Sequence, residues 1–357
     1  MTIIHVSEAD VTEETGMGRV AWHWKRAFQR RGHDFVEIGP SQIGTVPHKA
    51  LLPRRAYGIY RKQRAKADLF LVHEPLSGAF VSRGVKTVAF SHGLERRKWQ
   101  LTTAGAFGSE INVRWRTRLF FPLWRIRPCD AGIRRADLSL LINSEDASFA
   151  KTYYGLGSDR FRIFQNGVYP SRNPPTNRRT GQCIILFLGT WCGRKGIKTL
   201  ADAARILFQR GVEVQWILAG TGVDSEQIFQ QWPQELRNST EVIKSFKRTE
   251  EEDLYQRCDI FVLPSLYEGQ PLAMLQAMET GRCCVASNCC GQKDIIKNLQ
   301  NGLLHAPGEP ADLAAQLEQA ARSEPLRDRL GRAAHAAVAG RHWDKVSAEV
   351  VSLVEGL

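Results

Sequence analysis

Short apolar runs recur along the second half of the chain, each followed by a segment with helical spacing of apolar residues. The runs are CIILFLG, VQWILAG, EVIKSF, IFVLP and CCVAS, and the helices predicted after them span 197–210, 224–236, 250–257, 271–280 and 293–298. Continuous apolar runs of this length are typical of strands buried on both faces. Strands that alternate with helices predict a parallel sheet with crossover helices.

The first half repeats this pattern. Its apolar runs are TIIHVS, DFVEIG, DLFLVHEP, KTVAFSHG and DLSLLINS, with a helix predicted from Val20 to about Arg31. A polar, proline-rich stretch at 161–181 separates the two halves and is interpreted as a linker. We therefore expect an α/β protein of two Rossmann-like domains, 1–168 and 169–340.

Composition agrees with a globular chain of two domains, since the 357 residues are 43% hydrophobic and 24% charged. Without a run of about 18 apolar residues or a signal-peptide pattern, we expect a cytoplasmic protein, unless it rests on a membrane face. The net charge of +12 is uneven: residues 1–170 hold 27 Lys and Arg against 15 Asp and Glu, and residues 171–357 hold 22 against 22. The two halves are thus expected to meet different partners.

Two adjacent cysteine pairs, Cys283 with Cys284 and Cys289 with Cys290, raise the alternative of a zinc site. The first pair lies in a predicted strand, whereas zinc ligands are usually spaced by two to four residues on a knuckle. We interpret all these cysteines as free thiols and expect no metal site.

Glu268 lies just before a predicted helix, at the end of the IFVLP strand. Pro271 stands where a first-turn proline is tolerated, and Gly281 ends the helix. The free N–H groups and dipole of a helix N-terminus favour an anion, and a carboxylate accepts hydrogen bonds from sugar hydroxyls. An anion beside a polyol indicates a nucleotide sugar.

The segment SLYEGQPLAMLQAMETGRCCVAS resembles the signature of glycosyltransferase family 4. This resemblance implies the GT-B fold, two Rossmann-like domains facing across a cleft, with a closing helix at 341–357 that returns to the first domain. It implies that Glu268 holds donor-sugar hydroxyls, and that the residues entering the helix, Gly269, Gln270, Pro271 and Leu272, lie at the donor. The family's second Glu, which holds the ribose, is replaced by Gln276; an amide can still make that contact.

Two further motifs in the first half match the family. Gly16 and Gly18 also match a dinucleotide fingerprint, but about nine residues separate Ser7 from Gly16, so a loop that closes over a diphosphate fits better. His92 and Gly93 resemble the family's His-Gly, whose imidazole contacts the donor sugar. His73 ends a neighbouring strand and is a weaker candidate.

In the second half, Arg194 and Lys195 follow the first strand and are expected to neutralise the diphosphate. Thr190 stands where the family has an arginine, and Arg194 is expected to replace it. Gly220 ends the next strand and is expected to border the nucleotide. The resemblance implies that Phe246 and Lys247 lie near the base, although a Phe at a strand end is more often part of a core.

The resemblance implies a retaining glycosyltransferase that moves a sugar from a nucleotide sugar to a saccharide or lipid-linked saccharide. We expect it to work without a metal ion, because no Asp-x-Asp motif follows a strand. The alternatives are a degenerate non-catalytic GT-B partner subunit, suggested by Thr190 and Gln276, and a sugar-releasing relative such as a phosphorylase or an epimerase. Nucleic-acid binding would need a recognised module, which we do not find. The nucleotide, sugar, acceptor, linkage and oligomeric state stay open.

Basic and aromatic residues are interleaved in residues 95–135, with ten Lys and Arg against three acids, and a second basic cluster spans 49–66. Cations attract anionic headgroups and Trp favours the interfacial level, so we expect peripheral association with the inner membrane face. A solvated basic face or an anionic soluble acceptor are the alternatives.

Overall fold

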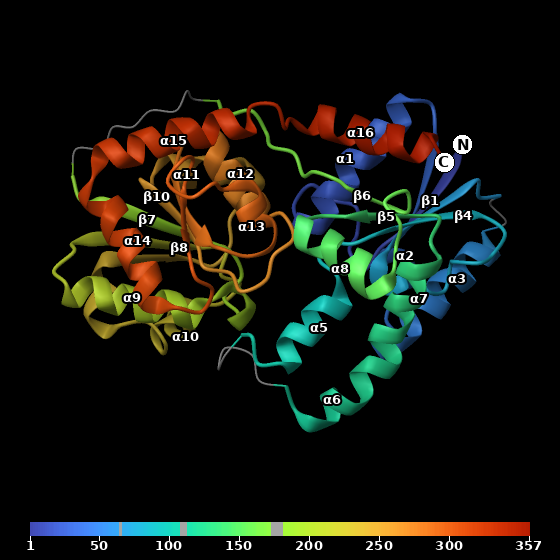
Figure 1. Cartoon of the computed structure of the whole chain (residues 1–357), viewed down its shortest axis with the longest axis horizontal. Coiled ribbons are helices and arrows are strands. Elements are labelled where there is room, and N and C mark those ends of the chain that lie inside the picture. Colours follow the sequence, from blue (N-terminus) through green and yellow to red (C-terminus); the bar gives the residue numbers. More distant parts are fainter. Residues whose placement is uncertain (64–65, 108–112, 173–180) are drawn as a thin grey trace. The chain divides into compact units, whose positions relative to one another are not determined.

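The computed structural model describes residues 1–63, 66–107, 113–172 and 181–357. The chain divides into two compact units (Figure 1). The first unit holds Met1–Ala106, Val113–Gly167 and Trp343–Leu357, and the second holds Phe107 and Val168–His342. Arg64 of the second basic cluster and residues 173–180 of the predicted linker lie outside the described residues.

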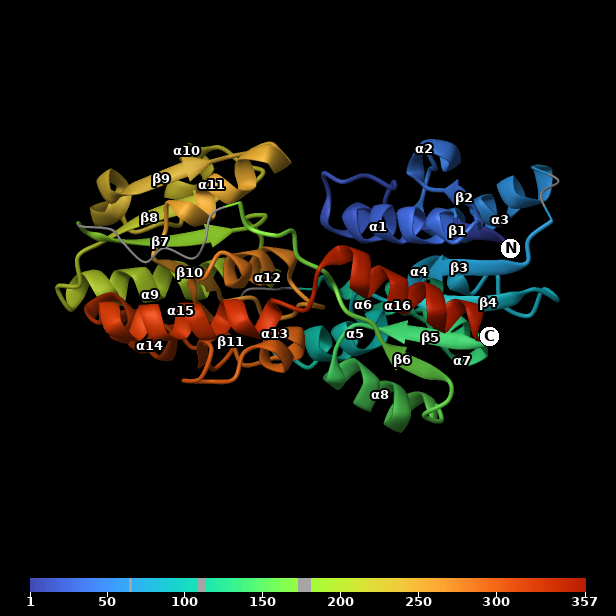
Figure 2. The same ribbon diagram turned by 90° about the horizontal axis from the view of Figure 1, so that it is seen from above.

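The first unit contains a six-stranded sheet in the order β2-β1-β3-β4-β5-β6, with every neighbouring pair parallel. Figure 2 shows β3 between β1 and β4. The strands are β1 (Thr2–Val6), β2 (Asp34–Ile38), β3 (Leu69–His73), β4 (Lys86–Phe90), β5 (Leu138–Leu141) and β6 (Phe161–Ile163). The carboxyl ends of β3 and β4 therefore lie side by side, which brings His73 close to the turn after Phe90.

Helices complete the first unit. They are α1 (Gly16–Arg30), α2 (Pro40–Ile43), η1 (Lys49–Leu51), α3 (Leu52–Lys62), α4 (Glu74–Ser77), α5 (Glu95–Thr103), α6 (Trp115–Phe121), the π-helical turn η3 (Pro122–Ile126), α7 (Arg127–Arg135), α8 (Ser144–Tyr154) and α16 (Trp343–Glu355). The last helix lies beside α1, although more than 300 residues separate them in sequence (Figure 1). Trp343 of α16 stacks on His23 of α1 with ring centroids 4.2 Å apart.

The second unit contains another six-stranded parallel sheet, in the order β12-β11-β10-β7-β8-β9. Its strands are β7 (Cys183–Leu188), β8 (Val214–Ala219), β9 (Thr240–Ile243), β10 (Ile260–Leu263), β11 (Cys283–Ser287) and β12 (Leu303–His305). Its helices are η4 (Gly193–Lys195), α9 (Ile197–Gln209), α10 (Ser225–Phe229), η5 (Gln234–Ser239), η6 (Arg248–Glu250), α11 (Glu251–Gln256), α12 (Leu272–Glu279), α13 (Cys290–Ile295), α14 (Pro310–Arg322) and α15 (Glu324–Val338).

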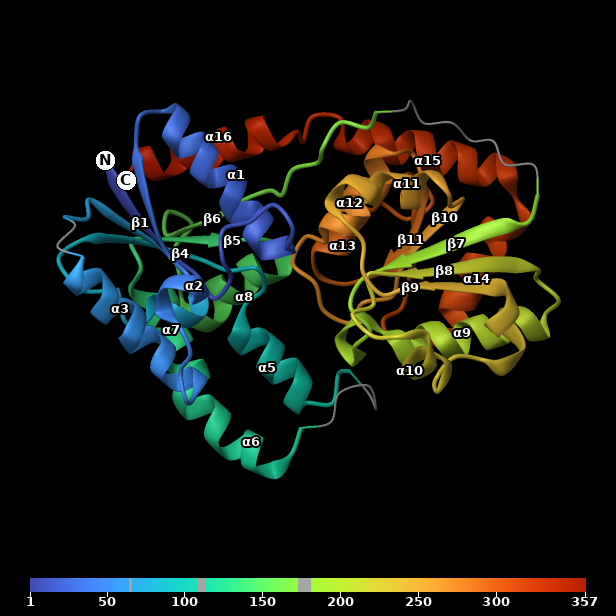
Figure 3. The ribbon, with the colours of Figure 1, turned by 180° about the vertical axis from the view of Figure 1, so that it is seen from behind.

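The two faces of this sheet build two separate cores. Alternate residues of β7 point to opposite faces. Ile185 and Phe187 belong to the core formed with α9 and α14, whereas Leu186 and Leu188 belong to the core formed with α11 and α12. Figure 3 shows α9 and α12 on opposite sides of β7 and β8. The continuous apolar run of β7 is thus explained by burial on both faces.

Several predicted boundaries are wrong. Helix α1 begins at Gly16 rather than Val20, because Thr15 is extended and its carbonyl accepts the Arg19 N–H at 2.7 Å. Residues 161–163, predicted as linker, form β6. The helix predicted at 224–236 is two short helices, α10 and η5, separated at Pro233, and β12 was not predicted at all.

Candidate functional site

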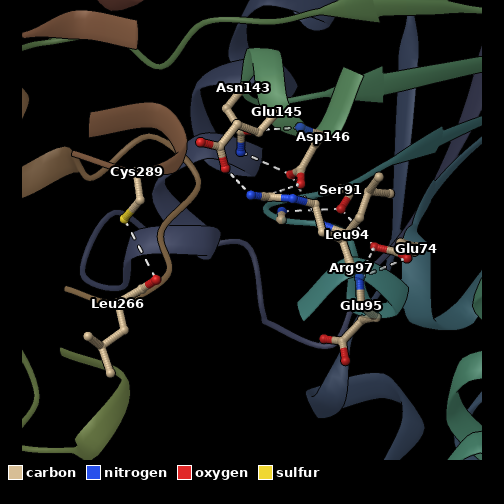
Figure 4. Close-up of polar contacts among 11 residues, drawn as sticks. Glu74, Ser91, Leu94, Glu95, Arg97, Asn143, Glu145, Asp146, Leu266 and Cys289 are labelled. Carbon is tan, nitrogen blue, oxygen red and sulfur yellow. Dashed lines mark hydrogen bonds and ion pairs between the residues drawn. The ribbon is translucent and has the colours of Figure 1, made fainter. Parts of the chain in front are cut away.

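Glu268 lies on the loop that joins β10 to α12, at the carboxyl edge of the second sheet. This edge is where open parallel sheets bind ligands. The loop is anchored to the η4 turn, since Leu266 donates its N–H to the Arg194 carbonyl at 2.9 Å. Cys289 adds a weak contact from its Sγ to the Leu266 carbonyl at 3.6 Å (Figure 4). Two loops that are distant in sequence are therefore held together.

The predicted catalytic residues of the second unit meet at this loop. The Oε1 of Glu268 lies 2.6 Å from the Nζ of Lys195 and 2.7 Å from a guanidinium nitrogen of Arg194. The same Arg194 nitrogen donates to the Tyr267 carbonyl at 2.9 Å. The structure thus brings Glu268, Arg194 and Lys195 into one cluster that contains two cations and one carboxylate.

The cluster keeps Glu268 ionised. Burial alone would raise the pKa of the Glu268 carboxyl, but Lys195 and Arg194 outweigh burial and lower that pKa to about 2. The net charge of the three side chains is positive at neutral pH. Such a cluster can meet the negative charge of a phosphate, while the second carboxylate oxygen accepts hydrogen bonds from hydroxyls.

Glycines open the backbone beside this cluster. Gly189, after β7, has φ +159° and its α-carbon faces the Lys195 side chain, which would lie 3.4 Å from an added Cβ. Gly220, after β8, has φ +66°, and an added Cβ would lie 3.0 Å from the Phe246 ring. A side chain at either position would be strained and would narrow the space next to the cations. Lys247 is exposed and follows Phe246 into η6.

The residues after Glu268 lead into the N-terminus of α12. Pro271 is the extended N-cap residue and Leu272 is the first helical residue. Gln270 is buried and accepts a hydrogen bond from Arg341 at 2.5 Å. The Gly269 carbonyl lies only 1.7 Å from the position of an added Cβ at Gly291, so α13 packs directly against the Glu268 loop. Close packing of this kind fixes the loop.

Gln276 makes contacts that the predicted ribose role did not include. Its Oε1 accepts the N–H of Tyr169 at 3.0 Å, and its Nε2 donates to the carbonyl of the same residue at 2.8 Å. Gln276 as a whole is 7% exposed. The amide therefore holds the segment that enters the second unit, with one donor and one acceptor matched to one peptide residue.

His92 lies in the first unit, in the turn that follows β4, among other aromatic rings. Its ring centroid is 5.6 Å from that of His73, 5.7 Å from that of Phe90 and 5.9 Å from that of Phe164. Burial lowers the pKa of His92 to about 4. The imidazole is therefore neutral at pH 7 and can both donate and accept a hydrogen bond.

Gly16 and Gly18 lie in the first turn of α1. Gly18 is packed against the preceding loop, because an added Cβ would lie 2.5 Å from the Asp10 carbonyl. Gly16 is exposed at the helix N-terminus. The predicted glycine-rich loop is therefore the start of a helix, whose free N–H groups can still bind an anion.

Two absences concern the part of the chain that the structure describes. In residues 1–63, 66–107, 113–172 and 181–357, no three His, Cys, Asp or Glu side chains come together in a group that could hold a metal ion. Within these same ranges, no helix is both long and apolar enough to span a bilayer. All eight cysteines are free thiols, and five of them are buried.

Comparison with known proteins decides what kind of domain the second unit is. Residues 171–337 match the family described as glycosyl transferases group 1. These residues form a group 1 glycosyltransferase domain. The Glu268 cluster lies inside this domain, and the resemblance to family 4 that the signature segment predicted is confirmed.

Relatives extend the likeness beyond the group 1 glycosyltransferase domain. Glycogen synthase of Mycobacterium tuberculosis is 26% identical over 278 residues, 77% of this chain and 64% of that protein. N,N'-diacetylbacillosaminyl-diphospho-undecaprenol alpha-1,3-N-acetylgalactosaminyltransferase of Campylobacter jejuni is 31% identical over 149 residues, 42% of this chain and 38% of that protein. The chain thus spans less than two thirds of the length of these relatives.

Solved structures show the fold. Sucrose-phosphate synthase of Thermosynechococcus elongatus superposes with a TM-score of 0.82 at 18% identity, covering 99% of this chain and 98% of its own. HepE of Anabaena in complex with UDP-glucose superposes with a TM-score of 0.71 at 16% identity, with full coverage of both chains. The group 1 glycosyltransferase domain is therefore one half of a GT-B fold with two parallel sheets, as predicted.

Some contacts of the site carry no sequence signal. The backbone bond between Leu266 and Arg194 and the pairing of Gln276 with Tyr169 both join residues more than 70 positions apart. Glu74, which accepts hydrogen bonds from the turn that carries His92, follows His73 in the run DLFLVHEP. Its position next to a strand-end histidine is the signal that could have found it.

Proposed function

We propose that the protein transfers a sugar, with retention of anomeric configuration, from a nucleotide-sugar donor to a saccharide or lipid-linked saccharide acceptor, without a metal ion. The observation that supports this most is the cluster of Glu268, Arg194 and Lys195 at the carboxyl edge of the second sheet. The cations would take the diphosphate, and the carboxylate would take sugar hydroxyls.

The donor is assigned to the second unit and the acceptor to the first. Gly189 and Gly220 leave the backbone open next to Lys195 and Phe246, which suits the close approach of a nucleotide. His92, as a neutral imidazole, would hydrogen-bond the donor sugar near the reacting carbon. A bound UDP-glucose in the similar HepE supports a nucleotide-sugar donor.

In the proposed reaction an acceptor hydroxyl attacks the anomeric carbon from the face that the leaving diphosphate occupies. The bond between the anomeric carbon and the phosphate oxygen breaks, and a phosphate oxygen takes the hydroxyl proton. The nucleoside diphosphate leaves with its charge met by Lys195 and Arg194. Glu268 orients the sugar and forms no covalent bond with it, so its role is one of positioning the donor.

A lipid-linked acceptor is supported by two observations. The relative from Campylobacter jejuni acts, by its name, on a saccharide carried on diphospho-undecaprenol. In this chain, α6 and η3 expose Trp115, Leu119, Phe120 and Leu123, the side chains of which are 49% to 69% exposed. Arg114, Arg116 and Arg118 are exposed beside them. We propose that this segment rests on an anionic membrane surface at the cytoplasmic face.

Three cations of the predicted basic segment 95–135 are engaged in ion pairs within the unit. Arg96 and Arg97 are paired with Asp130 and Glu145, and Arg125 contacts Glu8 at 2.5 Å. Trp99 and Trp124 pack on Phe121 at ring distances of 4.8 and 5.2 Å. The membrane proposal therefore rests on the exposed residues of α6 and η3 and not on Arg96, Arg97 or Arg125.

A screen of UDP-, GDP- and ADP-sugars by thermal shift tests the donor half of the proposal. A donor at a hundred times its dissociation constant adds about 2.7 kcal/mol to the unfolding free energy. Product NMR then reports the anomeric configuration, and activity in EDTA reports the need for a metal. A non-catalytic partner subunit would bind a nucleotide sugar, or none, and turn over no acceptor. A phosphorylase or an epimerase would turn over without an acceptor alcohol.

A further inference from the structure

The turn that carries His92 is held by two buried carboxyl groups that the proposed reaction does not use. Ser91 precedes His92 at the end of β4, and α5 begins at Glu95. Glu74, at the start of α4, is 1% exposed, and Asp146, in the first turn of α8, is 0% exposed. Figure 4 shows both carboxyl groups directed at the short segment between Ser91 and Glu95.

Glu74 binds both ends of this turn. Its Oε2 accepts the Ser91 hydroxyl at 2.7 Å, and both of its oxygens lie within reach of the Glu95 N–H, at 3.1 and 3.3 Å. Asp146 accepts the N–H of Leu94 at 3.2 Å. The Gly93 N–H is taken by the Ser91 hydroxyl at 3.2 Å. Every N–H from residue 93 to residue 95 is thus accepted by a side chain.

The Leu94 and Glu95 N–H groups are free donors at the start of α5, and a carboxyl oxygen can accept them. Burying an ionised carboxylate costs free energy unless a cation pairs with it, and a carboxyl without such a partner becomes neutral instead. Asp146 has such a partner in Arg97, at 3.0 Å. Among the residues that the structure describes, no cation lies within ion-pair distance of Glu74, whose partners are the Ser91 hydroxyl and the Glu95 N–H. Burial raises the pKa of the Glu74 carboxyl to about 8, so at neutral pH it is mostly protonated and contacts the turn as a neutral group.

We infer that Glu74 and Asp146 are positioning residues that fix the turn from Ser91 to Glu95 so that the His92 imidazole is held in one place for the donor sugar. The inference rests on the proposed function for the role of His92. The contacts of Glu74 and Asp146 with the turn, here called the clamp, do not depend on that role. Since a small displacement of a catalytic group can reduce turnover about 10²-fold, the clamp would act on catalysis as well as on folding.

The clamp is tested by amide hydrogen exchange in the full chain. Glu74→Ala is expected to raise the exchange rates of the Leu94 and Glu95 amides at least tenfold. Asp137→Ala is the matched control, because Asp137 accepts the Thr87 N–H at 2.7 Å at the opposite end of β4. The control should leave the turn protected. Unchanged exchange in folded Glu74→Ala protein would overturn the clamp, whether or not the chain is an enzyme.

A double-mutant cycle tests the effect on catalysis. We expect Glu74→Ala to lower kcat about 10²-fold, and the Glu74→Ala/His92→Ala pair to be no slower than His92→Ala alone, because both changes remove the same positioned imidazole. Glu74→Gln keeps an oxygen for the Glu95 N–H and should recover most of the turnover. Asp137→Ala should combine with His92→Ala multiplicatively.

Multiplicative losses for Glu74→Ala and His92→Ala would reduce Glu74 to a structural residue and overturn the positioning role. Full activity of folded His92→Ala protein would instead remove His92 from the reaction. A wild-type chain without transfer to any acceptor would defeat the proposed function, and the exchange measurement would still decide the clamp.

Discussion

Glu268 carries ion pairs that its place on a loop did not predict. From the sequence, a loop carboxylate is expected to contribute to transfer and not to the fold. In the structure, Lys195 and Arg194 both contact it, and its side chain is only 11% exposed. We therefore expect Glu268→Gln to abolish most of the transfer and also to lower the free energy of unfolding by about 1.5–3 kcal/mol, the contribution of a hydrogen bond to a charged group.

The pH dependence of this loss has a definite sign. The pKa of Glu268 is lowered from 4.5 to about 2, by Lys195 and Arg194 acting against burial. A carboxyl group with a lowered pKa stabilises the fold above its unfolded pKa, and this contribution disappears as the pH falls through the folded pKa. The difference in the free energy of unfolding between wild type and Glu268→Gln should thus be largest at pH 7 and should shrink as the pH falls from 4.5 to 2. Urea titrations at several pH values measure it.

Asp202→Asn is the matched control for that experiment, because Asp202 also pairs with two cations, Lys198 and Arg205, but on an exposed helix surface. Exposed pairs of this kind contribute at most about 1 kcal/mol. A Glu268→Gln protein as stable as wild type at pH 7 would show that the buried cluster does not stabilise the fold.

Gln276→Glu restores the family's residue, and the sequence predicts that it is tolerated. The structure predicts the opposite at neutral pH. The introduced carboxylate would still accept the Tyr169 N–H but would face the Tyr169 carbonyl, to which Nε2 now donates at 2.8 Å. Leaving a buried acceptor without a donor costs about 1–3 kcal/mol. Because a protonated carboxyl can donate to the Tyr169 carbonyl, the loss of unfolding free energy in Gln276→Glu should shrink as the pH falls below 5.

Gln276→Met removes both hydrogen bonds without adding charge and serves as the control, since its loss should not change with pH. Equal or tighter donor binding by Gln276→Glu, with unchanged stability at pH 7, would return Gln276 to the ribose and show that the Tyr169 contact is dispensable.

Residue type and order predicted which side chains of the second unit would meet, because strand ends of a parallel sheet share one edge. Glu268, Arg194 and Lys195 all follow strands. The Glu268 Oε1 lies 2.6 Å from the Lys195 Nζ and 2.7 Å from an Arg194 guanidinium nitrogen. The partner of Gln276 could not be predicted in this way. Tyr169 offers only its backbone, which has the same donor and acceptor at every position, so no residue identity marks the contact.

At the level of elements, apolar runs located the central strands and the edge strands β2 and β9, but missed the edge strands β6 and β12. The strands β7, β8, β10 and β11 have four to six residues, and most of these are buried, so each gives a continuous apolar run. By contrast, the edge strands β6 and β12 have three residues each, and β6 is partly exposed. A strand of that length gives no periodic signal, so FRI was interpreted as linker.

Helix α6 gives a prediction at the scale of one element. Its exposed apolar side chains should enter the interface of an anionic bilayer, with Arg114, Arg116 and Arg118 binding headgroups at about 1 kcal/mol each. We expect the protein to sediment with vesicles that contain acidic lipid at low salt and to be released at high salt. Replacing Trp115 and Phe120 by Ser should weaken this binding at least tenfold while donor turnover on a soluble acceptor is kept.

Phe208→Ser is the matched control, since Phe208 is 48% exposed on α9 of the second unit, away from any predicted basic cluster. It should sediment like wild type. Absence of wild-type binding to acidic vesicles at low salt would defeat the membrane proposal and leave a soluble acceptor. Equal losses for both variants would show that general hydrophobicity, not α6, governs the binding.

At the scale of the whole molecule, chain order and unit membership differ. Trp343 follows the second unit in sequence but packs on His23 in the first, and Trp232 packs on Trp216 within the second. Both Trp residues are buried, so each Trp→Ala change should lower the free energy of unfolding by about 3–5 kcal/mol. If the units unfold separately, Trp343→Ala should lower the midpoint temperature of one calorimetric transition, and Trp232→Ala should lower that of the other.

A nucleotide-sugar donor assigns the transitions, because it is proposed to bind the second unit. Donor at a hundred times its dissociation constant should raise the midpoint temperature of the transition that Trp232→Ala lowers, since it adds about 2.7 kcal/mol to the unfolding free energy. The midpoint temperature of the other transition should not change. Lys195→Ala removes a donor contact without emptying a core, so it should reduce this shift while the transition without donor stays near that of wild type. A single transition that both Trp variants lower, and that donor raises as a whole, would mean that the two units unfold as one cooperative body.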